Sequence, residues 1–189
     1  MEELLVAIAV LLAVIGNIPY LLKILKKEIQ PHPYTWFIWS IVSCVTFFGA
    51  LSKGGGIGTI PILASEIFTI IIFLFSLQYG FKQIKKVDTI LLIVCLLGLI
   101  PWWLTSDPTI SVIAVVLIDL IAFIPTIRKT WANPGTEIYI LYSSNVLRHT
   151  LILYTLETTN IATSLHSVSM IVVNSIMTLI IIFKKKTKF

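Results

Sequence analysis

Residues 16–23 read Gly-Asn-Ile-Pro-Tyr-Leu-Leu-Lys, and residues 122–129 read Ala-Phe-Ile-Pro-Thr-Ile-Arg-Lys. Each stretch closes an apolar segment with Ile-Pro about one helical turn before a basic cluster. Each is followed by a loop that contains proline, at residues 30–36 and 133–137, and that opens into an aromatic-rich apolar segment. The shared pattern indicates an internal duplication, from which the organisation of the whole chain follows.

The rest of the chain is strongly apolar. Of its 189 residues, 57% are hydrophobic and 12% are charged, and the mean hydropathy is +0.98. Soluble domains carry about 25% charged residues, so this composition excludes an ordinary soluble domain and a disordered chain. The apolar runs are continuous and do not alternate with polar residues, which argues against a transmembrane β-barrel. We therefore predict an all-α integral membrane protein.

Seven apolar segments are long enough to cross the hydrocarbon core of a bilayer, which takes about 20 helical residues. They lie at residues 3–25, 34–52, 57–79, 88–105, 109–131, 138–155 and 160–183. Glu2 and Glu3 stand at the start of the first segment, whereas a cleavable signal peptide begins with a basic region. We therefore expect the first segment to be a transmembrane helix, and we predict seven such helices joined by short loops.

The cations lie almost entirely on one side of this arrangement. Of the 14 Lys and Arg residues, Lys53 falls on the other side and Arg148 lies inside a segment. The others follow the first, third and fifth segments or form the C-terminal tail: Lys23, Lys26, Lys27, Lys82, Lys85, Lys86, Arg128, Lys129, Lys184, Lys185, Lys186 and Lys188. Because cytoplasmic loops are enriched in Lys and Arg, we predict a multi-pass protein of the cell membrane with its N-terminus outside and its C-terminus in the cytoplasm.

This basic side also predicts partners. The cations form a collar that can contact anionic lipid head groups, so membrane lipids are expected partners. Nucleic acid is not expected, because the cations are divided among four separate segments and form no single basic stripe. His32, in the first of these loops, is expected to be solvated. A homo-oligomer is compatible with the sequence.

The duplication divides the chain into three parts. Residues 1–81 predict a first three-helix bundle, residues 82–108 a linker helix, and residues 109–189 a second three-helix bundle with a basic tail. Because a single helix joins the two bundles, both copies face the same way in this 3+1+3 plan. Such parallel repeats are related by an axis along the membrane normal.

Residues 16–39 and 122–142 resemble the PQ-loop motif, with a Pro near the inner end of a helix, a basic exit and an aromatic start of the next helix. The 3+1+3 plan resembles that of the PQ-loop and SWEET superfamily over nearly the whole chain. The motif's Gln after Pro is Tyr20 in the first copy and Thr126 in the second, which indicates a divergent, bacterial-type member. The resemblance implies a small-molecule carrier, in a superfamily that includes sugar uniporters, proton-coupled exporters and non-transporting receptors.

Three ionisable residues fall near the middle of their segments. A charge in the middle of a bilayer is energetically unfavourable, so each of them is a candidate functional residue. They are Glu66, Asp119 and Arg148. One Arg does not neutralise two separate carboxylates, so we predict that Arg148 pairs with Asp119, with Glu66 as the second candidate. The carboxylate left over, or His149, is a candidate for proton coupling. The alternative is a purely structural ion pair.

We predict a solute pocket at the midplane, between the two bundles. Asp119 and Phe123 share a helix face, and the repeat places Asn17 where the second copy has Phe123. A solute with one flat apolar side and one charged or hydrogen-bonding side fits this mixture. The predicted walls are Asn17, Trp39, Asp119, Phe123, Asn145 and Arg148. The alternatives are hydrogen bonds between helices for the two Asn residues and packing for Trp39. His166 is expected to pack.

Two prolines occupy matched depths in the two copies, Pro19 and Pro125. A Pro inside a membrane helix permits a kink, so the pair is either a hinge that opens the cytoplasmic side or two static kinks inherited by duplication. Cys44 and Cys95 fall in mid-segment and are expected to pack as small apolar residues. Their surroundings offer no set of metal ligands, so neither a metal nor a cofactor is expected.

The sequence contains no motif of a hydrolase triad or of a metal-dependent protease, so we expect no catalytic residues and no enzyme. We expect a carrier for a small organic solute that works by alternating access between the two bundles, with or without coupling to protons. The alternative is a non-transporting receptor, sensor or chaperone on the same scaffold.

Overall fold

The computed structural model describes residues 2–52, 60–104, 108–154 and 161–186, and within these it is helical with no strand. The elements in chain order are α1 (Glu2–Leu25), α2 (Pro33–Ser52), α3 (Ile60–Tyr79), α4 (Lys86–Leu104), α5 (Pro108–Ala132), the short 3₁₀ helix η2 (Pro134–Thr136), α6 (Tyr139–Tyr154) and α7 (Ile161–Lys186). The predicted all-α fold is confirmed, and each predicted segment corresponds to one α-helix. Lys53 and Lys188, which entered the charge count, lie outside the described residues.

Local sequence sets several of these boundaries. Pro33 and Pro108 are the first residues of α2 and α5, a position where the missing N–H costs nothing. The chain leaves α1 through Lys27, whose φ of 59° is left-handed. The N–H of Lys27 donates to the Ile24 carbonyl and that of Glu28 to the Lys23 carbonyl, both at 2.9 Å. This is a Schellman ending, which satisfies the last carbonyls of α1 and turns the chain toward α2.

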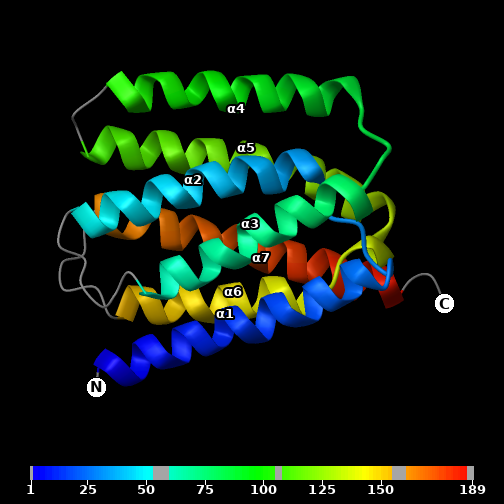
Figure 1. The fold of residues 1–189 in the computed structure, drawn as a ribbon, viewed down its shortest axis with the longest axis horizontal. Coiled ribbons are helices and arrows are strands. Elements are labelled where there is room, and N and C mark those ends of the chain that lie inside the picture. Colours follow the sequence, from blue (N-terminus) through cyan, green and yellow to red (C-terminus); the bar gives the residue numbers. More distant parts are fainter. Residues whose placement is uncertain (1, 53–59, 105–107, 155–160, 187–189) are drawn as a thin grey trace.

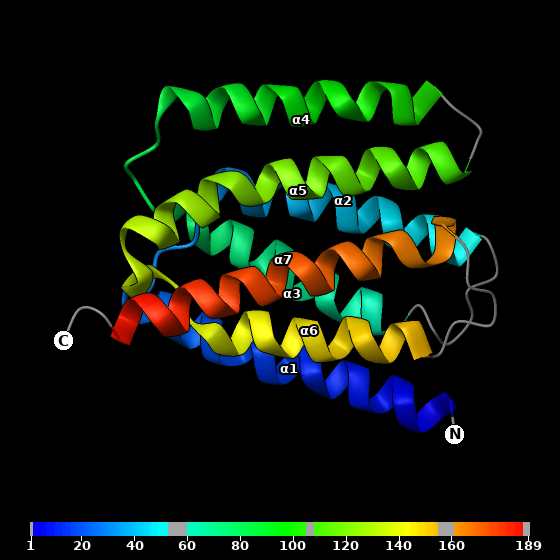
Figure 2. The same ribbon diagram turned by 180° about the vertical axis from the view of Figure 1, so that it is seen from behind.

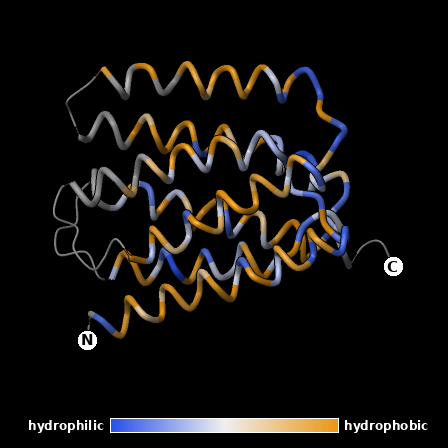
Figure 3. Tube along the Cα trace, in the orientation of Figure 1, coloured by the Kyte–Doolittle hydropathy of each residue, from blue (hydrophilic) through white to orange (hydrophobic). Residues whose placement is uncertain are grey.

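Within the described ranges, three helices are long and apolar enough to cross a membrane, through Glu3–Leu25, Ile60–Tyr79 and Ser164–Lys184. Large apolar side chains also cover much of the outer surface; Leu22 and Ile90, for example, are exposed. Figure 3 shows apolar residues along the lengths of the helices and hydrophilic residues gathered at one end. Such a surface suits a protein that has lipid around its sides.

The helices run roughly along one common axis, with α4 at one edge and α1 at the opposite edge (Figures 1 and 2). At one end of the bundle lie the connections 26–32, 80–85 and 133–138 and the end of α7 (Figure 1). This end, called the basic end below, carries the described cations of the predicted collar. The grouping agrees with the prediction that the first, third and fifth connections share one side with the C-terminal tail.

The helix contacts within the described residues follow a repeated scheme. Helix α3 packs against both α1 and α2, while α7 packs against both α5 and α6. The two groups meet where α1 contacts α6 and where α2 contacts α5. Helix α4 packs on α5 and α2. A core of buried apolar side chains runs across both groups, with Tyr20, Trp36, Phe123, Tyr142 and Met177 among its members.

Candidate functional site

A line of polar side chains crosses α5, α7 and α6. The Asp119 carboxylate (Oδ2) lies 3.3 Å from Nδ1 of His166. The His166 ring stands edge-on to that of His149, with centroids 5.5 Å apart. The Nδ1 of His149 lies 3.3 Å from the Ser167 hydroxyl, and its Nε2 lies 3.3 Å from Nη2 of Arg148. The structure thus brings together Asp119, His149 and Arg148 from the predicted site, together with His166, which was predicted only to pack.

The predicted ion pair between Arg148 and Asp119 is wrong. Among the described residues, α5 and α6 make no contact, because α7 packs between them. His166 of α7 therefore reaches Asp119, and Arg148 has a neutral His149 nitrogen in place of a carboxylate. Pairing with Glu66, the second candidate, is absent from the described ion pairs as well. Glu66 instead accepts a hydrogen bond from the Cys44 thiol (3.3 Å) across α2 and α3.

Aromatic rings fill the space where the two helix groups meet. The rings of Trp39 and Phe123 lie 4.3 Å apart between centroids. Trp39 also meets Trp36 edge-on at 5.0 Å, and Trp36 lies 5.4 Å from Tyr20. The predicted wall residues Trp39 and Phe123 therefore do come together from α2 and α5. In this conformation they contact each other directly.

The two predicted amide residues make local hydrogen bonds. Asn17 donates to the Ala13 carbonyl at 2.8 Å, within α1. Asn145 of α6 donates to Oδ1 of Asn174 of α7 at 3.5 Å. This is a hydrogen bond between helices, which was the alternative to a role in the solute pocket. Close to both, α1 and α6 approach tightly at Gly16, where an added Cβ would lie 2.1 Å from the Ser144 hydroxyl. The amides thus belong to helix packing in this conformation.

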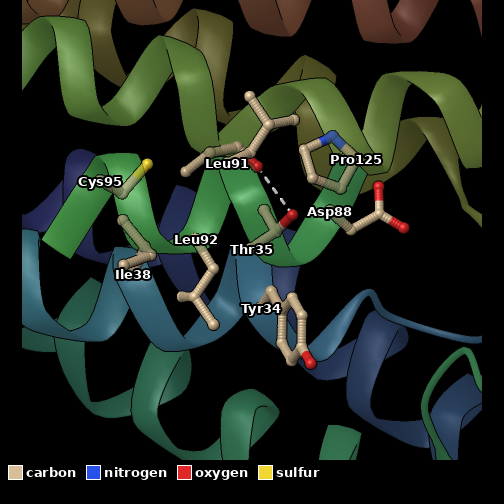
Figure 4. Close-up of a pocket in the computed structure, with 9 residues that line it drawn as sticks. Tyr34, Thr35, Ile38, Asp88, Leu91, Leu92, Cys95 and Pro125 are labelled. Carbon is tan, nitrogen blue, oxygen red and sulfur yellow. Dashed lines mark hydrogen bonds between the residues drawn. The ribbon is translucent and has the colours of Figure 1, made fainter. Parts of the chain in front are cut away.

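Pro125 lines a small pocket between α2, α4 and α5 (Figure 4). Its volume of about 10 Å³ corresponds to roughly one water molecule. Thr35 donates to the Ala122 carbonyl at 2.7 Å and accepts from the Thr126 hydroxyl at 3.0 Å. The Thr side chains thus hold α2 against the proline-containing part of α5. The pocket is too small for an organic solute and lies beside α4, away from the predicted midplane site.

At the basic end, a buried ion pair joins the end of α5 to the connection that follows it, and Gln30 binds this pair to the connection that follows α1. The Lys129 ammonium contacts the Glu137 carboxylate and donates to the Gln30 carbonyl. The Gln30 N–H in turn donates to the Thr136 carbonyl at 3.1 Å. The side chains of Lys129 and Glu137 are both fully buried. The prediction that Lys129 belongs to a collar that contacts lipid head groups is therefore wrong, because its side chain is enclosed by the two connections.

Two buried tyrosines complete this cluster. Tyr20 of α1 and Tyr142 of α6 both lie beside the Glu137 carboxylate. Residues from both helix groups therefore meet around one buried acid. Sequence reasoning missed Glu137, whose only signal was its place two residues before the aromatic start of α6.

His32 is also buried at the basic end, so the prediction that it is solvated is wrong. Its Nε2 lies 3.6 Å from the Asp88 carboxylate, which also pairs with Arg128 and accepts the Lys85 N–H at 2.8 Å. The pKa of His32 falls from its usual 6.5 to about 4, chiefly because burial penalises the charged ring. Lys129 and Arg128 also lower this pKa, and Asp88 opposes them.

We expect this histidine to make the protein acid-sensitive. Between the folded pKa of about 4 and the ordinary 6.5, the unfolded chain binds a proton at His32 that the folded protein does not. Stability should therefore rise with pH across this window and be lost as the pH falls through it. Thermal unfolding in detergent at a series of pH values measures the slope. His32→Gln should flatten the profile, and an unchanged profile would contradict this account.

Within the described residues, no three His, Cys, Asp or Glu side chains converge where they could hold a metal ion. No family model, curated protein or solved structure matches this chain. Its function is therefore argued from its own geometry.

Proposed function

We propose that the chain is a membrane carrier for a small organic solute that works by alternating access. The observation that carries this proposal is the contact scheme of the helices. Exchanging α1, α2 and α3 for α5, α6 and α7 leaves the contacts among these six helices unchanged, because the contact of α1 with α6 becomes that of α5 with α2. Two such units around an interior site are the usual construction of carriers built from parallel repeats. Helix α4 then acts as the linker.

The side chains at the interface between the units differ between the basic end and the middle of the bundle. This difference supports a closure at the basic end that opens to admit or release the solute. Aromatic rings and the hydrogen bonds of Gln30 with Lys129 and Thr136 close the interface there. Arg148 and His149 lie in the half of α6 away from the basic end. Pro19 and Pro125 lie in the halves of α1 and α5 that are nearer the basic end, one in each unit. We propose that they act as the hinge pair when the basic end opens.

The proposal includes seven membrane spans with the basic end in the cytoplasm. Cysteine labelling tests this arrangement on a background without Cys44 and Cys95. A membrane-impermeant maleimide should label Gly55→Cys in intact cells and Thr187→Cys only after permeabilisation. The cationic residues that follow α1, α3 and α5 give the physical reason. Labelling of Thr187→Cys from outside would overturn the orientation.

Flux into proteoliposomes tests transport itself. Compounds that stabilise the protein in a thermal-shift screen should enter vesicles that contain it and not protein-free vesicles. Proton coupling would use Glu66, Asp119 or His149, so an imposed pH gradient should drive uptake. Glu66→Gln or Asp119→Asn should then abolish that drive. Flux that ignores the gradient and survives both substitutions would leave a uniporter.

The second candidate is a receptor, sensor or chaperone on the same scaffold. The observation that favours it is the pair of hydrogen bonds that Gln30 makes with Lys129 and Thr136, which would have to break before the basic end could open. A protein that only binds its solute would keep this pair intact. Ligand binding in detergent without flux in vesicles would identify this function.

A further inference from the structure

Within the described residues, Arg148 is a buried cation that no carboxylate contacts. The residue is 8% exposed, and its Nε has no hydrogen-bond partner in the described part of the chain. The polar contact that the described residues give it is a ring nitrogen of His149, at 3.3 Å from Nη2. Asp119 is directed to His166 and Glu66 to Cys44. An uncompensated buried charge is strongly destabilising, so such a group is expected to serve a purpose.

The position of Arg148 on α6 places it at the interface of the two units. Leu141, Ser144 and Arg148 recur at three- and four-residue spacing and so share one face of the helix. Gly16 of α1 closely approaches Leu141 and Ser144 on this face. The face that carries Arg148 is therefore turned toward the other unit.

The opposite wall provides no negative charge. Helices α1 and α6 run antiparallel (Figure 1), so one turn beyond the Gly16–Ser144 contact, Arg148 lies at the level of Ala13. Ala13 and the next residue on that face, Ala9, are buried and small. The part of α1 that faces Arg148 is thus apolar and carries only small side chains.

We propose that the solute is a small organic anion, a carboxylate with a flat apolar body, and that Arg148 binds its negative group. A guanidinium matches a carboxylate with two parallel hydrogen bonds. The flat body would lie against Trp39 and Phe123, the latter one turn along α5 from Asp119. The assignment rests on the proposed function, because Trp39 and Phe123 contact each other in this conformation and the units must separate to admit a solute.

Calorimetric titration of the purified protein in detergent at pH 7 tests the assignment with two matched probes, benzoate and its neutral isostere benzamide. Benzoate should bind at least about tenfold more tightly, which corresponds to about 1.4 kcal/mol. Arg148→Gln should remove this preference. Arg128→Gln, which removes the same charge beside Asp88 at the basic end, should retain it.

Each outcome decides the assignment. Equal affinity for the two probes, binding of neither, or a preference that survives Arg148→Gln would overturn it. If Arg148→Gln does not fold, Arg148→Lys decides, because it keeps the charge and loses the planar fork. Weaker benzoate binding supports the assignment and unchanged binding overturns it. Benzoate binding without flux would refute the carrier alone, and flux of another solute without benzoate preference would refute the anion site alone.

Discussion

Replacing Glu137 by Gln is expected to lower the free energy of unfolding by about 3–5 kcal/mol, because it leaves the Lys129 ammonium buried without its counter-charge. The side chains of both residues are fully buried, so water does not replace the lost partner. The substitution keeps the size of the side chain and isolates the effect of charge. Unfolding of the purified protein by a denaturing detergent, followed by tryptophan fluorescence, measures the change.

Glu28 offers a matched control in the neighbouring connection. It pairs with Lys23 at 2.6 Å, and both side chains are exposed. The paired ammonium lowers the pKa of Glu28, but exposed pairs contribute little to stability. Glu28→Gln should therefore leave unfolding nearly unchanged. The double variant Lys129→Met with Glu137→Gln should recover part of the loss, since it removes the unpaired charge. Equal effects of Glu28→Gln and Glu137→Gln would refute the distinction between the two pairs.

The Glu137 prediction also bears on opening of the basic end. The hydrogen bonds of Gln30 with Lys129 and Thr136 join the two units, and Glu137 pairs with the Lys129 ammonium that makes one of them. In a carrier, weakening this link should favour the state that is open at the basic end. A cysteine beside the link should then react faster with maleimide in the Glu137→Gln variant. In a receptor that never opens, the reaction rate would stay the same.

The helices could be predicted from the sequence because each is a continuous apolar run bounded by Pro, Gly or basic residues. Segment 109–131, for example, corresponds to α5 at Pro108–Ala132. The matched places of Pro19 in α1 and Pro125 in α5 could be predicted too, since the Ile-Pro and basic pattern is local. Both features depend on residues close together in the chain, which is where periodicity and composition carry information.

The contacts of the charged residues could not be predicted in the same way. Depth along a helix places Asp119 and Arg148 at one level. Depth does not tell, however, that another helix, α7, packs between the helices that carry them. Lys129 and His32 sit where apolar segments end, a position that normally meets head groups or water. Their burial depends on how the connections fold back over the helix ends, and this is a property of tertiary structure that no local pattern encodes.

Replacing Gly16 by Ala is expected to cost about 1–3 kcal/mol of stability by overpacking the contact between α1 and α6. The added Cβ would lie 2.1 Å from the Ser144 hydroxyl oxygen and 3.3 Å from its Cβ. The hydroxyl can rotate only by giving up its bond of 2.9 Å to the Leu141 carbonyl, and the Cβ contact would remain tight. Gly135→Ala, whose Cβ would meet Asn133 at an ordinary 3.5 Å, is the control and should change little.

The size of Ser144 should decide the outcome at Gly16, because the clash is with that side chain alone at short range. Ser144→Gly removes both close atoms, so Gly16→Ala combined with Ser144→Gly should be more stable than the sum of the two single changes predicts. Thermal midpoints of the four proteins in this cycle measure the coupling. If the two effects simply add, the approach of α1 to α6 does not depend on this contact. If the two substitutions are coupled, the contact of Gly16 with Ser144 is what sets the distance between α1 and α6. The two units would then have to pivot about this contact when one end of the bundle opens.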